Sequence, residues 1–158
     1  MNIDTEREQL FSLLPHRPPM LLLNRVIAVD NKKSEAEVII TADSPFFIAD
    51  KGVPAWIGIE YMGQTAALIA GYQQQKQPKK ELQLGFLLGT RRYSAHVDWF
   101  FSGKPLYIYC EEEAIVGDSL ATFSCRIEAD QVLAQANLTV YRKAIGEKKN
   151  SQSTGGKK

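Results

Sequence analysis

Apolar and polar residues alternate along the second half of the chain in a pattern typical of half-buried strands. We predict strands over residues 105–116, 120–129 and 132–141, separated by turns at Gly117-Asp118 and Asp130-Gln131. Strands that follow one another through such short turns pair as antiparallel hairpins. The pattern therefore predicts one antiparallel sheet in this half of the chain.

The first half of the chain changes period more than once. A helix is expected over residues 4–14, with Asp4 as its N-cap and Pro15 as its end. Two further strands are expected, over residues 20–29 and 34–41. This half therefore adds one helix and one hairpin to the sheet.

A long helix is predicted over residues 54–75, with Pro54 at its first position. It is apolar almost all round, and such a helix is normally wrapped by other structure. A strand over residues 84–97 follows, with Gly89 marking a β-bulge. The element order predicts an α+β fold in which one curved antiparallel sheet wraps around a long central helix. Open sheet edges favour pairing into a dimer.

The length of 158 residues fits one domain, expected over residues 1–143, followed by a disordered basic tail over 144–158. The stretch from Arg142 onward holds six basic residues and one acid, so the rest is acidic, which argues against nucleic-acid binding. The sequence shows no secretory leader or membrane span, and we expect a cytoplasmic protein. Cys110 and Cys125 are expected as small apolar residues of strands, with a disulfide only if they are cross-strand neighbours.

Glu60 is the unusual residue of the central helix, because it interrupts an apolar run. Burial disfavours the charged form of a carboxyl group, so a buried Glu60 would suit a general acid near neutral pH. Gln64 lies one turn further on, on the same face. The alternative is that Glu60 simply reaches solvent at the start of the helix, where an acid also complements the helix dipole. The sequence pattern leaves both interpretations open.

His16 is the second candidate, because histidine is the usual group for proton transfer near pH 7. It lies in a proline-rich connector, where a lone histidine is more often structural, with its ring bonded to the backbone. Arg17 and other basic residues are candidates for a rim that binds phosphopantetheine or an acidic carrier protein, although solvated surface charges are the plainer explanation. No metal site and no cofactor are expected, since the few His and Cys residues lack metal-ligand spacing.

Two segments resemble the signatures of a known family, the hotdog-fold 3-hydroxyacyl-acyl-carrier-protein dehydratases of the FabZ and FabA type. The first is Leu13-Leu14-Pro15-His16-Arg17-Pro18-Pro19-Met20-Leu21-Leu22-Leu23-Asn24-Arg25-Val26. The second is Pro45-Phe46-Phe47 followed by Pro54-Ala55-Trp56-Ile57-Gly58-Ile59-Glu60-Tyr61-Met62-Gly63-Gln64. The start of the central helix and the run from Gly85 to Arg91 resemble most the ApeP-like subfamily associated with aryl-polyene clusters.

The resemblance implies a hotdog domain, a homodimer or heterodimer, and a tunnel for the acyl-phosphopantetheine arm at the subunit interface. By position it assigns Glu60 as the catalytic carboxylate and Gln64 as its supporting glutamine, with Pro54, Ala55 and Trp56 as a substrate-binding helix start. Two features depart from the family pattern. The loop that carries the family's catalytic histidine reads Ile48-Ala49-Asp50-Lys51-Gly52 here, and Asn24 replaces the usual aspartate.

These observations lead to one preferred hypothesis and two alternatives. The preferred function is dehydration of a 3-hydroxyacyl thioester, carried by acyl-carrier protein or CoA, in fatty-acid or aryl-polyene biosynthesis. In this hypothesis His16 is the base, Glu60 the acid or water-orienting group, and Gln64 bonds to Glu60. The alternatives are a non-catalytic acyl-binding subunit of a hotdog heterodimer, and a hotdog acyl thioesterase.

Overall fold

The computed structural model describes residues 3–76, 82–90, 92–117 and 119–144. The helical and strand elements, in chain order, are α1 (Ile3–Leu13), β1 (Arg25–Val29), β2 (Lys33–Val38), β3 (Val53–Pro54), η1 (Ala55–Ile57), α2 (Gly58–Lys76), β4 (Leu82–Thr90), β5 (Ser94–Ala95), β6 (Trp99–Phe100), β7 (Leu106–Val116), β8 (Leu120–Glu128) and β9 (Val132–Ala144). Of these, η1 is a single 3-10 turn that leads directly into α2.

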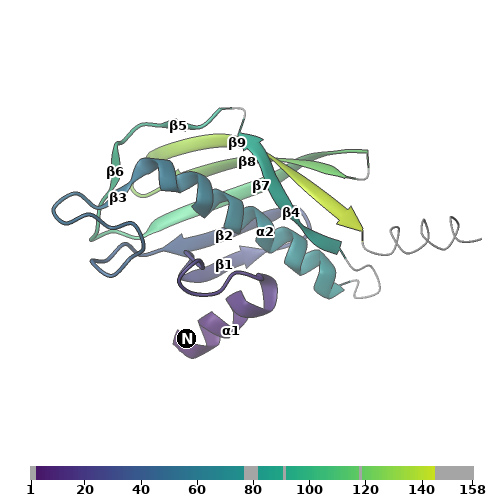
Figure 1. Cartoon of the computed structure of the whole chain (residues 1–158), viewed down its shortest axis with the longest axis horizontal. Coiled ribbons are helices and arrows are strands. Elements are labelled where there is room, and N and C mark those ends of the chain that lie inside the picture. The colour runs from purple at the N-terminus through teal and green to yellow at the C-terminus, as the bar shows by residue number, and fades with distance from the viewer. Residues whose placement is uncertain (1–2, 77–81, 91, 118, 145–158) are drawn as a thin grey trace, which may run out of the picture.

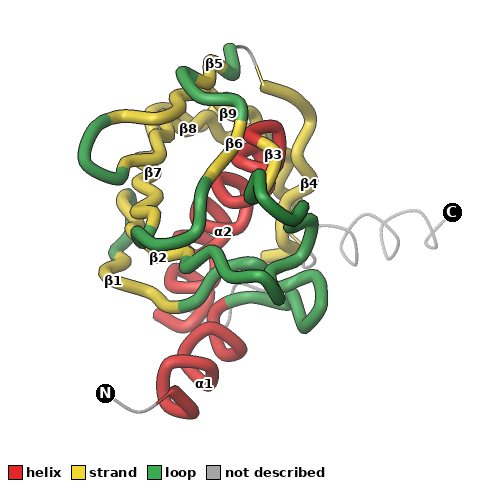
Figure 2. The backbone as a smooth tube through the Cα atoms, turned by 90° about the vertical axis from the view of Figure 1, so that its left-hand side faces the viewer, coloured by secondary structure: helices red, strands yellow, loops and turns green. Residues whose placement is uncertain are grey.

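The main sheet has the strand order β1-β2-β7-β8-β9-β4, and β5 adds a short pairing to β9. Every pairing is antiparallel. The sheet curves around α2, as the end-on view in Figure 2 shows, and α1 lies outside it, beside β1 and the C-terminal half of α2 (Figure 1). The predicted architecture, a curved antiparallel sheet around a long central helix, is confirmed.

The inner face of the sheet is apolar because every second residue of each strand points toward α2. One row of cross-strand neighbours, Ala36, Ile108, Ile127 and Ala134, is completely buried. The central helix contributes Met62, Leu68 and Ile69 to the same core, and these are also completely buried. The alternation in the second half of the chain thus supplies most of the core.

The backbone corrects two local predictions and confirms a third. The expected strand over 20–29 is shorter, because the strand pairing with β2 begins only at Arg25. Pro54 does not open the central helix, since it pairs with Trp99 in the small β3–β6 sheet and precedes η1. The bulge expected at Gly89 is confirmed by a register shift between Leu87 and Gly89 in the pairing of β4 with β9.

Cys110 and Cys125 are directly opposed in the pairing of β7 with β8. Both are buried and free, with their Sγ atoms 2.9 Å apart. Burial raises the pKa of the Cys110 thiol well above its ordinary value. The predicted behaviour as small apolar residues is therefore confirmed, and the cross-strand proximity that a disulfide would need is also present.

Of the tail expected over 144–158, residues 145–158 lie outside the described residues, so the domain boundary stays a prediction. Within the described ranges, no helix is both long enough and apolar enough to cross a bilayer.

Helix α1 contacts α2 where Gly71 meets the last residue of α1. A Cβ at Gly71 would overlap the Leu13 carbonyl oxygen and lie 2.9 Å from the Leu13 carbonyl carbon. Leu10, Leu13 and Leu14 are buried there, as the sequence predicts for one face of this helix. The absent side chain of Gly71 thus allows the close approach of the two helices.

We expect Gly71→Ala to lower the free energy of unfolding by about 1–3 kcal/mol, because backbone atoms of Leu13 must shift. The matched control is Gly63→Ala in the same helix, where the described residues place no atom within 4 Å of a new Cβ. Alanine is the better helix former, so the control should gain up to about 1 kcal/mol. Urea denaturation of both variants checks this, and equal losses would contradict it.

Candidate active site

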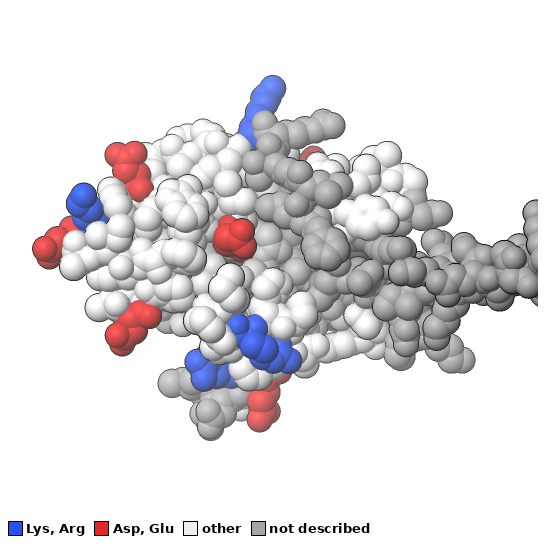
Figure 3. All heavy atoms as spheres, in the orientation of Figure 1, with Lys and Arg blue, Asp and Glu red and all other residues white. Residues whose placement is uncertain are grey.

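Glu60 lies in the first turn of α2, on the side that the sheet leaves uncovered. Its side chain is exposed in the single chain, so the expectation of a buried carboxyl is wrong for one subunit alone. The physical reason is that the sheet covers only part of the helix. The uncovered stripe of α2 continues from Glu60 through the half-buried Gly63, Ala67 and Ala70. Among the described residues in Figure 3, most charged groups lie toward the edge of the face that carries α2, and one acidic group lies near its middle.

His16 lies in the connector between α1 and β1 and is half-buried. Its Nδ1 atom is fully buried and is the one such side-chain atom without a hydrogen-bond partner in the described part of the chain. Desolvation lowers the pKa of His16, and the charge of Glu60 raises it by a smaller amount. The two predicted catalytic groups are therefore near enough within one subunit for the charge of Glu60 to act on the pKa of His16.

Gln64 is buried, but it does not bond to Glu60 as predicted. Its Oε1 accepts the Leu22 backbone N–H at 2.9 Å, and its Nε2 donates to the Met20 carbonyl at 2.8 Å. The segment from Met20 to Leu22 thus forms with the Gln64 side chain the hydrogen bonds that a strand would form with a neighbouring strand. Gln64 fixes this connector against α2, which is a supporting role of a different kind from the expected one.

Arg17 is directed to the C-terminal end of α1. Its Nη1 donates to the carbonyls of Leu14 and His16 at 2.8 Å each, and its Nη2 donates to the Phe11 carbonyl at 3.2 Å. A cation at the end of a helix satisfies free carbonyls and complements the dipole. The contacts of Arg17 are therefore those of a residue that caps a helix. These contacts do not test its predicted role in substrate binding. Asn24 is likewise structural, since its Oδ1 accepts the Ile39 N–H at 2.7 Å.

The predicted helix start, Pro54 to Trp56, forms the transition from β3 into η1. Trp56 is 62% exposed and lies one turn before Glu60. Its ring makes an edge contact with the ring of Phe46, with centroids 6.0 Å apart. Phe46 has a φ of 68°, an uncommon conformation for a large side chain. This aromatic pair was missed from the sequence because the two residues are separated by a loop without periodicity.

A second feature that the sequence did not signal is Tyr93. Its hydroxyl donates a hydrogen bond to the Ala55 carbonyl oxygen, so the segment after β4 reaches the start of the central helix. A tyrosine in a polar connector carries no pattern that indicates such a long-range partner.

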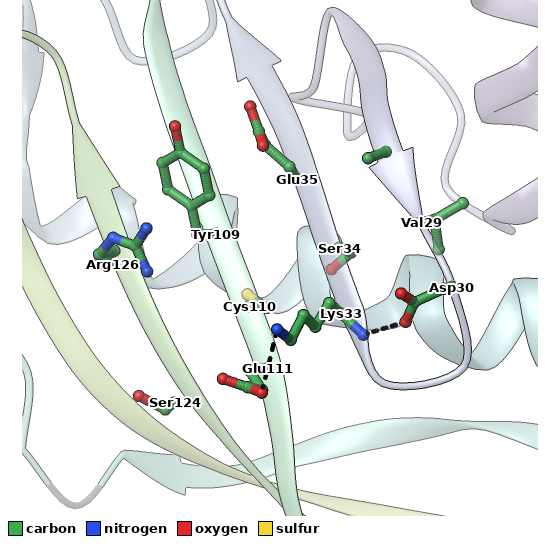
Figure 4. Close-up of a pocket in the computed structure, with 11 residues that line it drawn as sticks. Val29, Asp30, Lys33, Ser34, Glu35, Tyr109, Cys110, Glu111, Ser124 and Arg126 are labelled. Carbon is green, nitrogen blue, oxygen red and sulfur yellow. Dashed lines mark hydrogen bonds and ion pairs between the residues drawn. The ribbon is translucent and has the colours of Figure 1, made fainter.

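The outer face of the sheet carries a hollow of about 350 Å³ that is remote from this site, on the face turned away from α2 (Figure 4). Two of its cations have partners on the same face of the sheet. Lys33 lies 3.7 Å from Glu111, and the Arg126 guanidinium lies 4.1 Å from the centre of the Tyr109 ring. We therefore assign the chemistry to the helix side of the sheet.

Comparison with known proteins identifies the family. A family model described as ApeP-like, ApeP dehydratase, matches residues 8–152. The chain belongs to the ApeP-like family. A solved structure of the dehydratase heterocomplex ApeI:P from Xenorhabdus doucetiae is 29% identical, with a TM-score of 0.77 over 87% of this chain and 93% of that one. A hypothetical thioesterase protein solved with coenzyme A from Streptococcus pneumoniae, 8% identical with a TM-score of 0.59 over 90% of this chain and 98% of that one, shares the fold alone. The predicted hotdog fold is confirmed.

Curated relatives of this ApeP-like chain include two 3-hydroxyacyl-acyl-carrier-protein dehydratases named FabZ. The protein from Ralstonia nicotianae is 33% identical over 60% of this chain and 61% of its own length. The protein from an Anaeromyxobacter species is 34% identical over 49% of this chain and 52% of its own length. The chain thus spans less than two thirds of the length of these relatives. The predicted resemblance to this dehydratase family is confirmed.

We expect Gln64→Ala to leave the Leu22 N–H and the Met20 carbonyl unpaired, at a cost of about 1–3 kcal/mol of stability. Amide hydrogen exchange should show loss of protection at Leu22. Gln75→Ala is the matched control, because Gln75 is exposed and its side-chain amide donates to the Ser12 carbonyl, away from Leu22. Unchanged exchange at Leu22 in Gln64→Ala would contradict the assigned clamp.

We expect Glu60→Gln to lower the pKa of His16 further, because the Glu60 charge is what raises it. NMR titration of His16 measures the shift, and Glu113→Gln, at an exposed position of β7, serves as the control. The sign for stability follows from the lowered pKa. Unfolded His16 binds a proton more readily, so its contribution is present above the ordinary value of 6.5 and is lost as the pH falls below it. An unchanged pKa of His16 in Glu60→Gln would contradict the proximity of His16 and Glu60.

Proposed function

We propose that this chain dehydrates 3-hydroxyacyl thioesters to 2-enoyl thioesters, with the acyl group carried by acyl-carrier protein or CoA. The observation that carries the proposal is that His16 has a buried Nδ1 without a hydrogen-bond partner and lies within reach of the charge of Glu60. Membership of a family described as dehydratases supports it. The proposed setting is the cytoplasm, in fatty-acid or aryl-polyene biosynthesis.

In the proposed mechanism His16 removes a proton from C2 of the acyl group, and Glu60 protonates the hydroxyl that leaves C3. The C2–H and C3–O bonds break, the C2–C3 double bond forms, and water departs. Desolvation lowers the pKa of His16 and so favours the neutral imidazole that a general base requires. Backbone N–H groups at the start of the central helix would polarise the thioester carbonyl as the enolate develops.

A second hotdog subunit completes the proposed site. In the described part of the chain β4 pairs with β9 alone, which leaves the other edge of β4 open for a further strand. A partner there would also cover the stripe of α2 that holds Glu60 and would bury its carboxyl. The solved heterocomplex that this chain is similar to supports a pairing of two hotdog chains. The proposal covers a homodimer and a heterodimer alike.

The second candidate function is that of a non-catalytic subunit in such a pair. The observation that favours it is the loop over residues 48–52, which holds no histidine where the family resemblance places one. In this case the acyl group would bind across the interface, and the partner subunit would supply the catalytic base.

We expect Glu60→Ala and His16→Ala each to reduce conversion of a 3-hydroxyacyl carrier substrate by about 100-fold or more. Absorbance of the conjugated enoyl thioester measures turnover, and release of free thiol measures any thioesterase activity in the same sample. Glu113→Ala and His96→Ala, both at exposed positions, are the matched controls.

The assay is run on the chain alone and on the chain co-expressed with a second hotdog subunit. Turnover that survives both active-site variants at the wild-type rate contradicts the proposed mechanism. Turnover only with the partner, insensitive to His16→Ala and Glu60→Ala, identifies this chain as the non-catalytic subunit.

A further inference from the structure

The start of the central helix is held by the chain segment that follows β4. The Ala55 N–H donates to the Asp98 carbonyl at 2.9 Å, and the Ala55 carbonyl accepts the Tyr93 hydroxyl. The preceding residue, Pro54, pairs with Trp99 in the small sheet. Both backbone polar groups of Ala55 are therefore bonded to residues of one other segment.

The Ala55 carbonyl oxygen also closes the 3-10 turn, because it accepts the N–H of Gly58. The Tyr93 hydroxyl thus bonds to the atom at which the 3-10 turn passes into α2. Gly58 is part of the same arrangement. A Cβ there would overlap the Tyr93 hydroxyl and lie 2.9 Å from Cδ1 of Ile127, so the missing side chain admits the tyrosine.

The turn held in this way carries the groups that face the proposed substrate. Trp56 lies within it, and Glu60 follows one turn later on the same exposed side of the helix. The free N–H groups of a helix start belong to these first residues. A small rotation of the turn would therefore change the direction of the Glu60 carboxyl and of the N–H donors together.

We propose that Tyr93 is a positioning residue for the dehydration reaction, acting by fixing the turn from Ala55 to Gly58 on which Glu60 and the carbonyl-polarising N–H groups depend. This inference rests on the proposed function. It assigns to the segment after β4 a role in catalysis that neither the sequence pattern nor the family resemblance indicated.

The chemistry of Tyr93 suits this role. The residue is half-buried, and desolvation raises its pKa to about 12. The hydroxyl therefore stays protonated, and remains a donor, throughout the range in which an enzyme of this kind works. The restraint on the turn is independent of pH as a result.

The test compares Tyr93→Phe with Tyr109→Phe, which removes a hydroxyl from the outer face of the sheet, where Tyr109 stacks with Arg126. We expect Tyr93→Phe to lower kcat by about tenfold, a fraction of the effect of losing an oxyanion donor outright. KM should stay within about twofold, because the substrate contacts themselves remain. The shape of the pH profile should be unchanged, and Tyr109→Phe should match the wild type.

A second measurement needs no turnover. In a Trp99→Phe background, Trp56 is the remaining tryptophan and its fluorescence reports the turn. We expect Tyr93→Phe to lower the fluorescence anisotropy of Trp56 and to increase its quenching by acrylamide, with no change for Tyr109→Phe. Wild-type kcat together with unchanged Trp56 fluorescence in Tyr93→Phe overturns the inference, as does an effect on KM alone. Absence of turnover by the wild-type chain, both alone and co-expressed with a second hotdog subunit, overturns the proposed function instead, and the fluorescence then decides whether Tyr93 fixes the turn.

Discussion

The packing of α2 against a sheet that covers it only in part is the interaction on which the rest of the structure depends. The covered side is apolar and fully buried against strands β2, β7, β8 and β9. The uncovered side presents Trp56, Glu60 and then small residues. Burial of apolar area supplies the main stabilising term, of about 25 cal/mol per Å². The same geometry leaves the polar helix start at the rim, where a substrate and a second subunit can reach it.

Two long-range hydrogen-bonding groups convert flexible connectors into defined parts of this rim. Gln64 bonds the backbone after the His16 connector, and Tyr93 bonds the backbone before α2. Gln64 satisfies backbone atoms of residues 20–22 that no strand pairs, which matters because an unpaired polar atom is costly when buried, and Tyr93 adds a second donor to the Ala55 carbonyl. Of the two groups that could exchange a proton, Glu60 is carried by the central helix itself, and His16 by a connector that Gln64 ties to that helix.

The sequence predicts the sheet well because burial on one face enforces a strict period of two. The inward residues of β7 and β8, Cys110 and Cys125 among them, follow directly from that alternation. The failures are of another kind. Residues 20–24 are apolar enough for a strand, but their backbone partner is a side chain of the helix, and periodicity does not show such a partner. For Glu60 the sequence left a buried and an exposed carboxyl equally open, because the pattern of α2 does not say how far a sheet will reach around the helix.

The buried Cys110 and Cys125 pair has a consequence for how motion of this fold is observed. The Cys110 thiol lies against the Met62 carbonyl of the helix, 3.4 Å away, and is sealed from solvent. A thiol reagent gains access only when the strands part from the helix, so its rate of reaction counts those openings. The rate of thiol modification therefore reports how often the interface between the central helix and the sheet opens.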